Sequence, residues 1–309
     1  MTQFYAKIIA TNPTSYDTNT LSVLTETEAK KEPINQRPTT IRIDENVTLN
    51  DGDVYFFNTE PTVHNDKEQL LVIDYVPMDD KAKTLGEKER LMRLFYTFAP
   101  ADIEAVKASI ERTMGTLENP AIKTLTQTIY DKHKDRFYLY PAATRFHHAY
   151  IGGLAHHTET MLRVADGLLK VYTFLNADLL YAGIILHDVC KTIELSNYKD
   201  PEYTTEGRLI GHITMGVKAI TKAATEHGIY DTEEWMLLEH IILSHHYYGN
   251  FGSPKKPNVP EALALHFIDN IDSKFAVLGE ALDTIEPGTF TPSLPVPDRE
   301  RFYKPKMKK

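Results

Sequence analysis

Short apolar runs, rich in β-branched and aromatic residues, follow one another along the first 80 residues. Turn-forming residues separate them at 12–13, 50–53 and 65–66. The runs predict strands at residues 4–9, 21–24, 39–43, 54–57 and 70–75. Five short strands in such a segment predict a small β-barrel of the OB type, although half of a β-sandwich would give the same pattern.

After residue 80 the apolar residues recur at spacings of three and four, which is typical of amphipathic helices. Asp102 and Asn119-Pro120 are the expected helix starts. The segment 179–186 is apolar on nearly all sides, so we expect a buried helix there, whereas the Pro- and Gly-rich segment 249–260 predicts a loop. The chain is therefore predicted to be a multidomain α+β protein. Its expected parts are an OB-like β-domain at 1–80, a helical connector at 81–140 and an all-α helical bundle at 141–309.

Composition places the chain among globular proteins, because 42% of its 309 residues are hydrophobic and 25% are charged. It holds no run of about 18 apolar residues that would span a membrane. Its N-terminus lacks the basic and apolar pattern of a secretory signal. The single cysteine, Cys190, cannot form an internal disulfide. Together these features favour a cytoplasmic protein without membrane partners.

The charge is unevenly distributed along the chain. Residues 1–80 hold 6 Lys/Arg and 14 Asp/Glu, a net charge of −8, whereas residues 81–309 hold 28 and 29, a net charge of −1. Because an acidic surface repels a polyanion, we expect any nucleic acid contact to lie on the larger part or on a metal. The last eleven residues, 299–309, are basic, and we expect a solvated tail there rather than a binding segment.

Histidines are concentrated in the helical region: nine of the 13 fall between residues 156 and 269. Several of them, with Asp188, lie at predicted helix ends, and Asp269 lies on the last predicted helix. Such residues can converge on one point when helices pack as a bundle. The candidate metal ligands are His157, His187, Asp188, His212, His245, His246 and Asp269. Mixed nitrogen and oxygen ligands suit Mn²⁺, Fe²⁺, Co²⁺ or Zn²⁺. Seven ligands exceed the needs of one ion, so we expect two ions with Asp188 as the bridge.

The order His157, His187-Asp188, Asp269 resembles the H…HD…D signature of the HD-domain metal-dependent phosphohydrolases. The additional His212 and His245-His246 resemble the two-metal branch of that superfamily. The surrounding sequence is similar to the YhaM-type 3′-to-5′ exoribonucleases from about residue 100 to the C-terminus. The similar segments are 140–144, 146–148, 152–154, 178–183, 186–188, 243–246, 252–255, 269–274 and 301–305.

This resemblance implies an N-terminal OB-fold, an HD domain that uses the seven ligands, and Mn²⁺ as the activating ion. It also implies removal of nucleotides from the 3′ ends of single-stranded RNA or DNA, and it makes a homo-oligomer plausible. Asp272 is the alternative last ligand, but the superfamily pattern places the ligand first in Asp-x-x-Asp, at Asp269. Two features depart from the family. Cys190 stands where a glycine is usual, and we expect it to pack inward as a small hydrophobic residue. The acidic first 80 residues match the OB region poorly.

The expected reaction is attack of a metal-activated hydroxide on the terminal phosphorus, with release of a nucleoside 5′-monophosphate. Asp188 and Lys191 are the predicted catalytic residues, and Lys191 is also expected to bind the phosphate. Arg145, His148, Lys255 and Lys274 are further candidates for substrate contact.

The barrel offers Tyr55, Phe56 and Phe57 as candidates for base stacking. Strand geometry puts Tyr55 and Phe57 on one face and Phe56 on the other, and core packing is the favoured interpretation of these rings.

Two other functions compete with this prediction. An HD phosphohydrolase could act on free or cyclic nucleotides, with the β-domain as a regulatory module, and the acidic N-terminal segment favours this somewhat. A non-catalytic nucleic-acid-binding factor could retain a vestigial site. The complete ligand set argues against a vestigial site, because a dead site would be expected to lose ligands.

Overall fold

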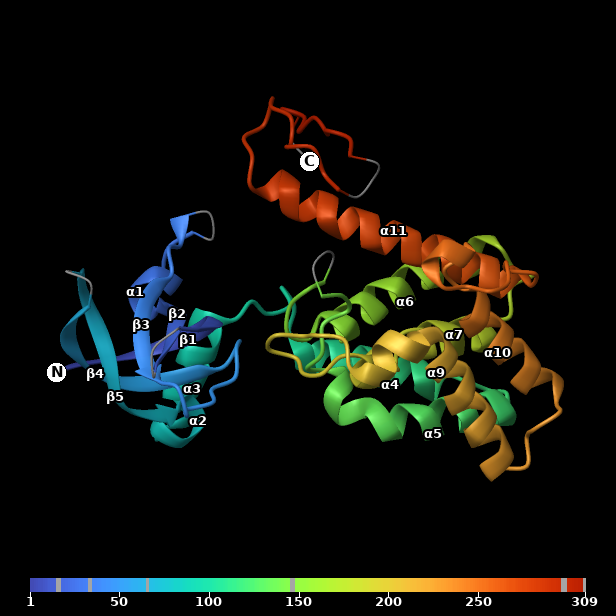
Figure 1. Ribbon diagram of the computed structural model, residues 1–309. Coiled ribbons are helices and arrows are strands. Elements are labelled where there is room, and N and C mark those ends of the chain that lie inside the picture. The colour runs from blue at the N-terminus through green and yellow to red at the C-terminus, as the bar shows by residue number, and fades with distance from the viewer. Residues whose placement is uncertain (15–17, 33–34, 65–66, 145–147, 296–298, 308–309) are drawn as a thin grey trace. The chain divides into compact units, whose positions relative to one another are not determined.

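The structure is a computed structural model that describes residues 1–14, 18–32, 35–64, 67–144, 148–295 and 299–307. It divides into two compact units, Met1–Phe98 and Ala99–Lys309. Figure 1 shows the elements in chain order, which are β1 (Thr2–Pro13), β2 (Thr18–Thr25), α1 (Glu26–Ala29), β3 (Thr39–Asp44), β4 (Val54–His64), β5 (Lys67–Pro77), α2 (Met78–Lys81), α3 (Leu85–Phe95), α4 (Ile103–Gly115), α5 (Pro120–Phe137), α6 (Gly153–Val171), α7 (Ala177–Leu186), α8 (Lys191–Glu194), α9 (Thr205–Glu226), α10 (Glu233–Ser244), the 3-10 turn η2 (Gly249–Phe251) and α11 (Pro260–Asp283). Residues 81–140, the expected connector, contribute α3 to the first unit and α4 and α5 to the second.

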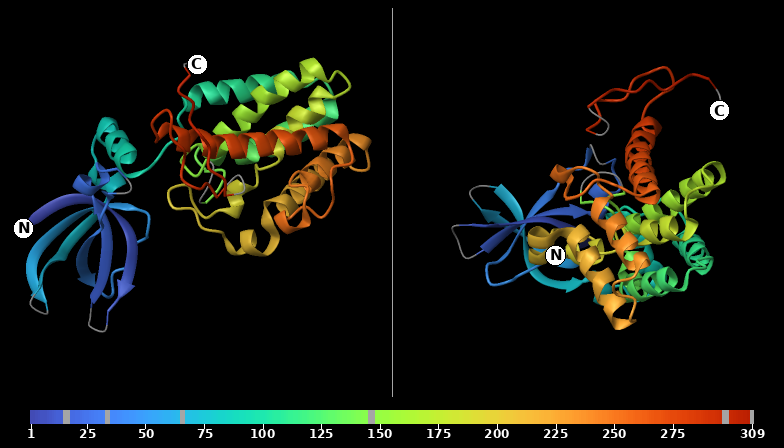
Figure 2. Two further views of the ribbon diagram at one scale, coloured as in Figure 1. Left: turned by 90° about the horizontal axis from the view of Figure 1, so that it is seen from above. Right: turned by 90° about the vertical axis from the view of Figure 1, so that its right-hand side faces the viewer.

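Five strands close into a barrel in the order β1-β2-β3-β5-β4, and Figure 2 shows them curving round from two further sides. Neighbouring strands are antiparallel except β3 and β5, which are parallel. Because successive strand residues point to opposite faces, every second side chain fills the interior. These inward side chains are Ala6, Ile8, Leu21, Val23, Ile41, Ile43, Tyr55 and Phe57. The predicted multidomain α+β fold with a small OB-like barrel is confirmed.

The three aromatic residues of β4 divide between the two faces as predicted. Tyr55 and Phe57 are 7% and 0% exposed and belong to the barrel core, so neither offers a face to a nucleobase. Phe56 points the other way, with its ring centre 5.0 Å from that of Tyr5 and 4.2 Å from the Lys81 ammonium. Core packing is therefore the role of Tyr55 and Phe57.

The helices of the second unit begin at the predicted caps. The Asp102 side chain accepts a hydrogen bond at the start of α4, and that of Asn119 accepts from the backbone N–H groups of Ala121 and Ile122 at the start of α5. Pro120 occupies the first turn of α5, where its missing N–H costs nothing.

Helix α7 lies at the centre of the second unit. Seven of its ten residues are buried, and it packs against α5, α6, α10 and α11. The apolar pattern of 179–186 therefore predicted a buried helix correctly. Its C-terminal end brings two polar residues, His187 and Asp188, into the interior. Within the described ranges, no helix combines the length and the hydropathy that a membrane span requires.

Residues 299–307 are mostly exposed, as their charge suggested, but they do not form a free tail. The segment folds back beside the end of α11, where Thr291 N–H donates to the Phe302 carbonyl at 2.9 Å. The Lys304 ammonium donates to the carbonyl oxygens of Leu282 and Ile285, both at 2.8 Å. Because the last carbonyls of a helix lack partners within it, this lysine caps α11.

Candidate metal centre

The buried end of α7 supplies the centre of the site. His187 and Asp188 are 1% and 4% exposed. The Nδ1 atom of His187 lies 2.8 Å from the carbonyl oxygen of Ile184. Since a carbonyl oxygen only accepts, Nδ1 carries the proton and Nε2 keeps its lone pair. The local helix end therefore fixes the tautomer that a metal ligand needs.

Two further ligand atoms lie beside the Nε2 atom of His187. His157 on α6 places its own Nε2 3.3 Å away. Asp269 on α11 places Oδ1 3.5 Å from the Nε2 of His157. The ligand atoms of these three residues all lie within 4.8 Å of one another. Two imidazoles and one carboxylate at this spacing make a donor set for a divalent transition metal.

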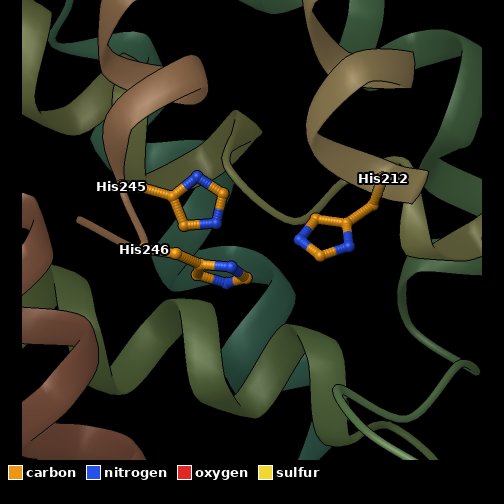
Figure 3. A group of neighbouring side chains, drawn as sticks. All are labelled: His212, His245 and His246. Carbon is orange, nitrogen blue, oxygen red and sulfur yellow. The ribbon is translucent and has the colours of Figure 1, made fainter. Parts of the chain in front are cut away.

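A second cluster consists of His212 on α9 and of His245 and His246, which follow α10. Their ligand atoms also lie within 4.8 Å of one another, and Figure 3 shows the three rings gathered around one space. Nδ1 of His245 donates to the Ile242 carbonyl at 2.7 Å, and Nδ1 of His246 donates to the Phe251 carbonyl at 2.6 Å. As with His187, the backbone takes the Nδ1 proton and leaves the Nε2 lone pair for a ligand.

The Asp188 carboxylate lies between the two clusters. Its Oδ2 is 3.3 Å from Nε2 of His187, and its Oδ1 is 3.3 Å from Nε2 of His212 and 4.0 Å from Nε2 of His245. Oδ1 and these last two nitrogens are buried, and among the described residues they have no hydrogen-bond partner. Because buried polar atoms are nearly always paired, three orphaned ligand atoms facing one point fit a cation.

Lys191 forms a buried ion pair with the central carboxylate. Its ammonium donates to Oδ2 of Asp188 at 2.6 Å and to the carbonyl of Ala142 at 2.7 Å. Burial lowers the pKa of Lys191, but Asp188 outweighs it, so the pKa is raised. Burial likewise raises the pKa of Asp188, but Lys191 and then His187 hold it well below its usual range. Both groups are therefore charged.

Protonation states in the rest of the site also follow from burial and neighbouring charge. Burial raises the pKa of Asp269, but the hydrogen bond and charge of His157 bring it well below its usual range. Burial lowers the pKa of His157, but Asp269 and Asp272 raise it to about 9. Burial, reinforced by His246, holds the pKa of His245 well below its usual range. A metal at the first cluster must therefore displace a proton from His157, whereas His245 is already neutral.

A kink in α9 and a buried glutamate position His212. Gly211 has φ 75° and ψ 152°, a conformation that is open to glycine and strained for other residues. The break frees the backbone N–H of His212 to donate to Oε1 of Glu194 at 2.9 Å, and Nδ1 of the same residue lies 3.0 Å from that oxygen. Nε2 is thereby directed at Asp188. His212 thus begins the segment after the kink, whereas α9 itself begins at Thr205.

Asp272, the alternative ligand, lies on a different side of His157 from Asp269. Its Oδ2 accepts from Nδ1 of His157 at 2.6 Å and from Nε2 of His148 at 2.7 Å. Asp269 instead faces the Nε2 atom that joins the first cluster. A carboxylate behind a metal-binding histidine fixes its tautomer and raises its basicity. The geometry therefore favours Asp269 as the ligand and Asp272 as the residue that orients His157.

A partly buried chain of hydrogen bonds continues behind Asp272. Nδ1 of His148 lies 2.6 Å from the Tyr150 hydroxyl, which is 3.0 Å from Nδ1 of His156. His148 has a left-handed backbone, with φ 53°. A Cβ atom on Gly153 would lie 2.0 Å from the His148 carbonyl oxygen, so only glycine fits there. The local sequence is therefore shaped to hold the His148 ring in place.

A cavity of about 400 Å³ opens over the ligands. The residues that line it include Asp188, Lys191, His212, His246, Asp269 and Lys274.

The substrate contacts predicted from the sequence fall into different places. Lys274 lines the cavity, whereas Lys255 is exposed on the 249–260 loop and is absent from the described cavity wall. His148 is 2% exposed and lies behind His157, which corrects the expectation that it touches substrate. Arg145 lies outside the described residues.

Cys190 packs into the apolar core, as expected of a small hydrophobic residue. It is 1% exposed, and burial, followed by the charge of Glu194, raises the pKa of its thiol to about 12. The thiol lies beside a second hollow with Ile129 and Met215, and in the described part of the chain it is absent from the wall of the metal cavity.

Sequence reasoning missed Glu194 and the supporting role of Asp272. Glu194 is 6% exposed and stands in the short helix α8, directly before the buried Leu195. The sequence signal that could have found Glu194 is its position six residues after Asp188 and directly before an apolar residue. Its partner, His212, is 18 residues further on, so the pairing itself is not visible in the pattern.

Comparisons with known proteins agree with this geometry. Residues 154–274 match the family model described as the HD domain. A 3′-5′ exoribonuclease YhaM of Geobacillus sp. is 44% identical over 211 residues, which cover 68% of this chain and 65% of that protein. A 3′-5′ exoribonuclease YhaM of Halalkalibacterium halodurans is also 44% identical over 211 residues, which cover 68% of this chain and 66% of that protein. The chain thus spans just under two thirds of the length of these relatives. No solved structure matches the chain. The resemblance drawn from the sequence is confirmed.

Proposed function

From the HD domain that this chain contains at residues 154–274, we propose that the protein is a metal-dependent 3′-to-5′ exoribonuclease that shortens single-stranded RNA. The two similar proteins bear that name, and the matched segment includes a substantial part of each. The observation that carries the proposal is the position of Asp188. Its two oxygens face two separate clusters of ligand atoms at the base of one cavity.

Two divalent cations would be held by these clusters. The first would use His157, His187 and Asp269, the second His212, His245 and His246, and Asp188 would contribute to both. We propose Mn²⁺ as the native ion, and the same donors accept Fe²⁺, Co²⁺ or Zn²⁺. When bound, such cations neutralise phosphoryl charge and lower the pKa of water toward neutrality.

The protein's own residues prepare and orient the substrate. Lys191 keeps Asp188 ionised and presents an ammonium at the cavity wall, where Lys274 adds a second cation for the phosphate. Glu194 and Asp272 hold the rings of His212 and His157, so the ligands need little rearrangement. The product in this proposal is a nucleoside 5′-monophosphate, released from the 3′ end.

The size of the cavity favours a single-stranded end. Its volume of about 400 Å³ falls in the range of small-molecule sites, roughly 300–1,000 Å³. One flexible terminus can enter such a space and a duplex cannot. The acidic first 80 residues are a poor surface for a polyanion, so we assign RNA binding to the helical unit. RNA as the substrate and a single buried thiol are consistent with activity in the cytoplasm.

A 5′-labelled single-stranded RNA incubated with Mn²⁺ tests the proposal. We expect a ladder that shortens from the 3′ end, nucleoside 5′-monophosphates in the product, and no ladder when a chelator is present. Asp200→Asn, which changes an exposed acid, should behave as the wild type. A parallel reaction on single-stranded DNA measures the preference for ribose.

The same experiment discriminates the competing functions. Release of phosphate from free nucleotides, with intact RNA, would replace the exoribonuclease with a nucleotide phosphohydrolase. RNA binding without metal uptake or hydrolysis would indicate a binding factor. Either result would overturn the proposal.

A further inference from the structure

Two exposed aromatic side chains stand in the wall of the metal cavity. Tyr203 is 47% exposed and Phe251 is 63% exposed, and both line the cavity that also holds Lys191 and Lys274. Large apolar side chains exposed beside a polar cavity commonly mark a binding site. The ammonium groups of Lys191 and Lys274 suit a phosphate, and the two aromatic rings suit a flat apolar group joined to that phosphate.

Tyr203 lies on a loop that is connected through Glu194 to His212 of the second cluster. Tyr203 pairs with Leu195 in an antiparallel bridge, and the next residue, Thr204, donates its backbone N–H to the Glu194 carbonyl at 2.9 Å. The Glu194 side chain holds His212. The backbone at Tyr203 is therefore held near that histidine through two short connections.

Phe251, in the turn η2, is hydrogen-bonded to His246 of the same cluster. Its carbonyl oxygen accepts from Nδ1 of His246 at 2.6 Å, and the His246 N–H donates to Oγ of Ser253 at 3.0 Å. The Tyr248 ring lies edge-on to Phe251, with centres 6.2 Å apart. Phe251 thus orients the candidate ligand His246 through its backbone carbonyl and lines the cavity with its ring.

We propose that Tyr203 and Phe251 form a nucleobase-stacking subsite for the 3′-terminal nucleotides of the substrate. This inference rests on the proposed function and specifies how that site holds its substrate. Every base has a π-face, so stacking on aromatic side chains tolerates any sequence. A base that is paired in a helix has its faces covered by its neighbours, so the subsite accepts unpaired ends. Sequence-independent shortening of single strands follows from these two properties.

Kinetics of matched variants tests the subsite. Phe251→Leu and Tyr203→Leu keep apolar bulk and remove the π-face. We expect KM for single-stranded RNA to rise about 5- to 150-fold while kcat is retained, the range for loss of one base–aromatic stack. Phe267→Leu and Tyr172→Leu are the controls, because these rings are 56% and 47% exposed and are absent from the described cavity wall. Their KM should equal that of the wild type.

An RNA whose last two nucleotides lack bases supplies the reciprocal control. The wild type should show a raised KM on it, and Phe251→Leu should add no further increase, because no base remains to stack. The subsite is wrong if wild type and variants share one KM on intact RNA. It is equally wrong if the wild type degrades the abasic RNA with an unchanged KM.

A binding measurement separates this inference from the proposed function. The probe is an RNA with 3′-terminal 2-aminopurine, joined through a non-hydrolysable phosphonate, added to the Mn²⁺-loaded protein. Stacking quenches its fluorescence, so we expect quenching by the wild type and less by Phe251→Leu. A wild type that quenches but does not shorten RNA would overturn the exoribonuclease and keep the subsite. A wild type that shortens RNA without quenching would overturn the subsite alone.

Discussion

The interior of the barrel and the interior of the helical unit are built on different principles. In the barrel, apolar side chains such as Ile8, Leu21 and Phe57 form the core, and each is at most 2% exposed. In the helical unit, the apolar helix α7 ends in a carboxylate oxygen that faces two histidine nitrogens, all three without partners among the described residues. The core side chains of the barrel are apolar and call for no ligand, whereas the metal centre gathers unpartnered ligand atoms at one place.

This difference shows where stability and function are separated in the chain. Burying unpaired polar atoms opposes folding, so the cluster around Asp188 is not explained by stability. The tautomers of His187 and His245 are fixed by backbone carbonyls, and that of His157 by Asp272. An arrangement that costs stability yet fixes every ring is characteristic of a preformed binding site.

The largest expected effect comes from removing the charge at the centre of the site. Asp188→Asn keeps the shape of the side chain and an acceptor for Lys191 but removes the negative charge that both clusters face. We expect kcat/KM on single-stranded RNA to fall by about 1,000-fold or more, at or above the upper end for loss of one electrostatic group. Fluorescence of Trp235, the single tryptophan, should show an unchanged helical unit. Activity within tenfold of the wild type would contradict the central role of Asp188.

The matching change in the barrel should affect stability and leave the metal centre alone. Phe57→Ala removes a fully buried ring, which costs about 3–5 kcal/mol of barrel stability. Hydrogen-exchange mass spectrometry should show faster exchange in the peptides of β1 to β5, with Mn²⁺ affinity unchanged. A variant that also loses Mn²⁺ affinity would show that the two interiors are coupled.

Metal should stabilise one interior and not the other. At a free Mn²⁺ concentration of 100 times Kd, a ligand that binds only the folded state adds about 2.7 kcal/mol. Trp235 lies in α10 with its indole N–H bonded to Glu239, so its fluorescence reports unfolding of the helical unit. We expect the thermal midpoint of this signal to rise with Mn²⁺ and to return with a chelator. Exchange in the barrel peptides should not respond, and an equal response there would contradict the separation.

The sequence pattern predicted the features that depend on neighbouring residues. Strand periodicity placed Tyr55 and Phe57 in the barrel core, and the apolar run of α7 predicted a buried end at His187 and Asp188. The side chain of Asn119 and the position of Pro120 marked the start of α5 in the same local way.

Features that depend on distant partners were not predictable from the pattern. Glu194 is recognisable as a support only when His212 is seen beside it, and the capping role of Lys304 requires the chain to fold back on α11. Asp269 and Asp272 are one helical turn apart, and both lie near His157. They are distinguished only by the nitrogen of His157 that each carboxylate faces, which is Nε2 for the proposed ligand and Nδ1 for the carboxylate that supports the ring.

The smallest expected effect comes from that distant support. Glu194→Gln removes the negative charge that holds His212, and an amide oxygen accepts more weakly from the backbone N–H and the imidazole. Loss of such a partner lowers metal affinity about 10- to 100-fold. A Mn²⁺ titration of RNA shortening should therefore shift to higher concentration, with kcat restored when Mn²⁺ saturates the site.

Restoration by excess metal is what separates orientation of a ligand from a general structural role. Glu206→Gln is the matched control, because Glu206 lies on the same helix as His212 but is exposed and pairs with Lys218 at 3.6 Å. Its Mn²⁺ titration should match that of the wild type. If Glu194→Gln lowers kcat at every Mn²⁺ concentration and lowers the thermal midpoint of Trp235 fluorescence, then Glu194 stabilises the fold. The metal centre would then depend on the packing around α8 and not on the orientation of one imidazole.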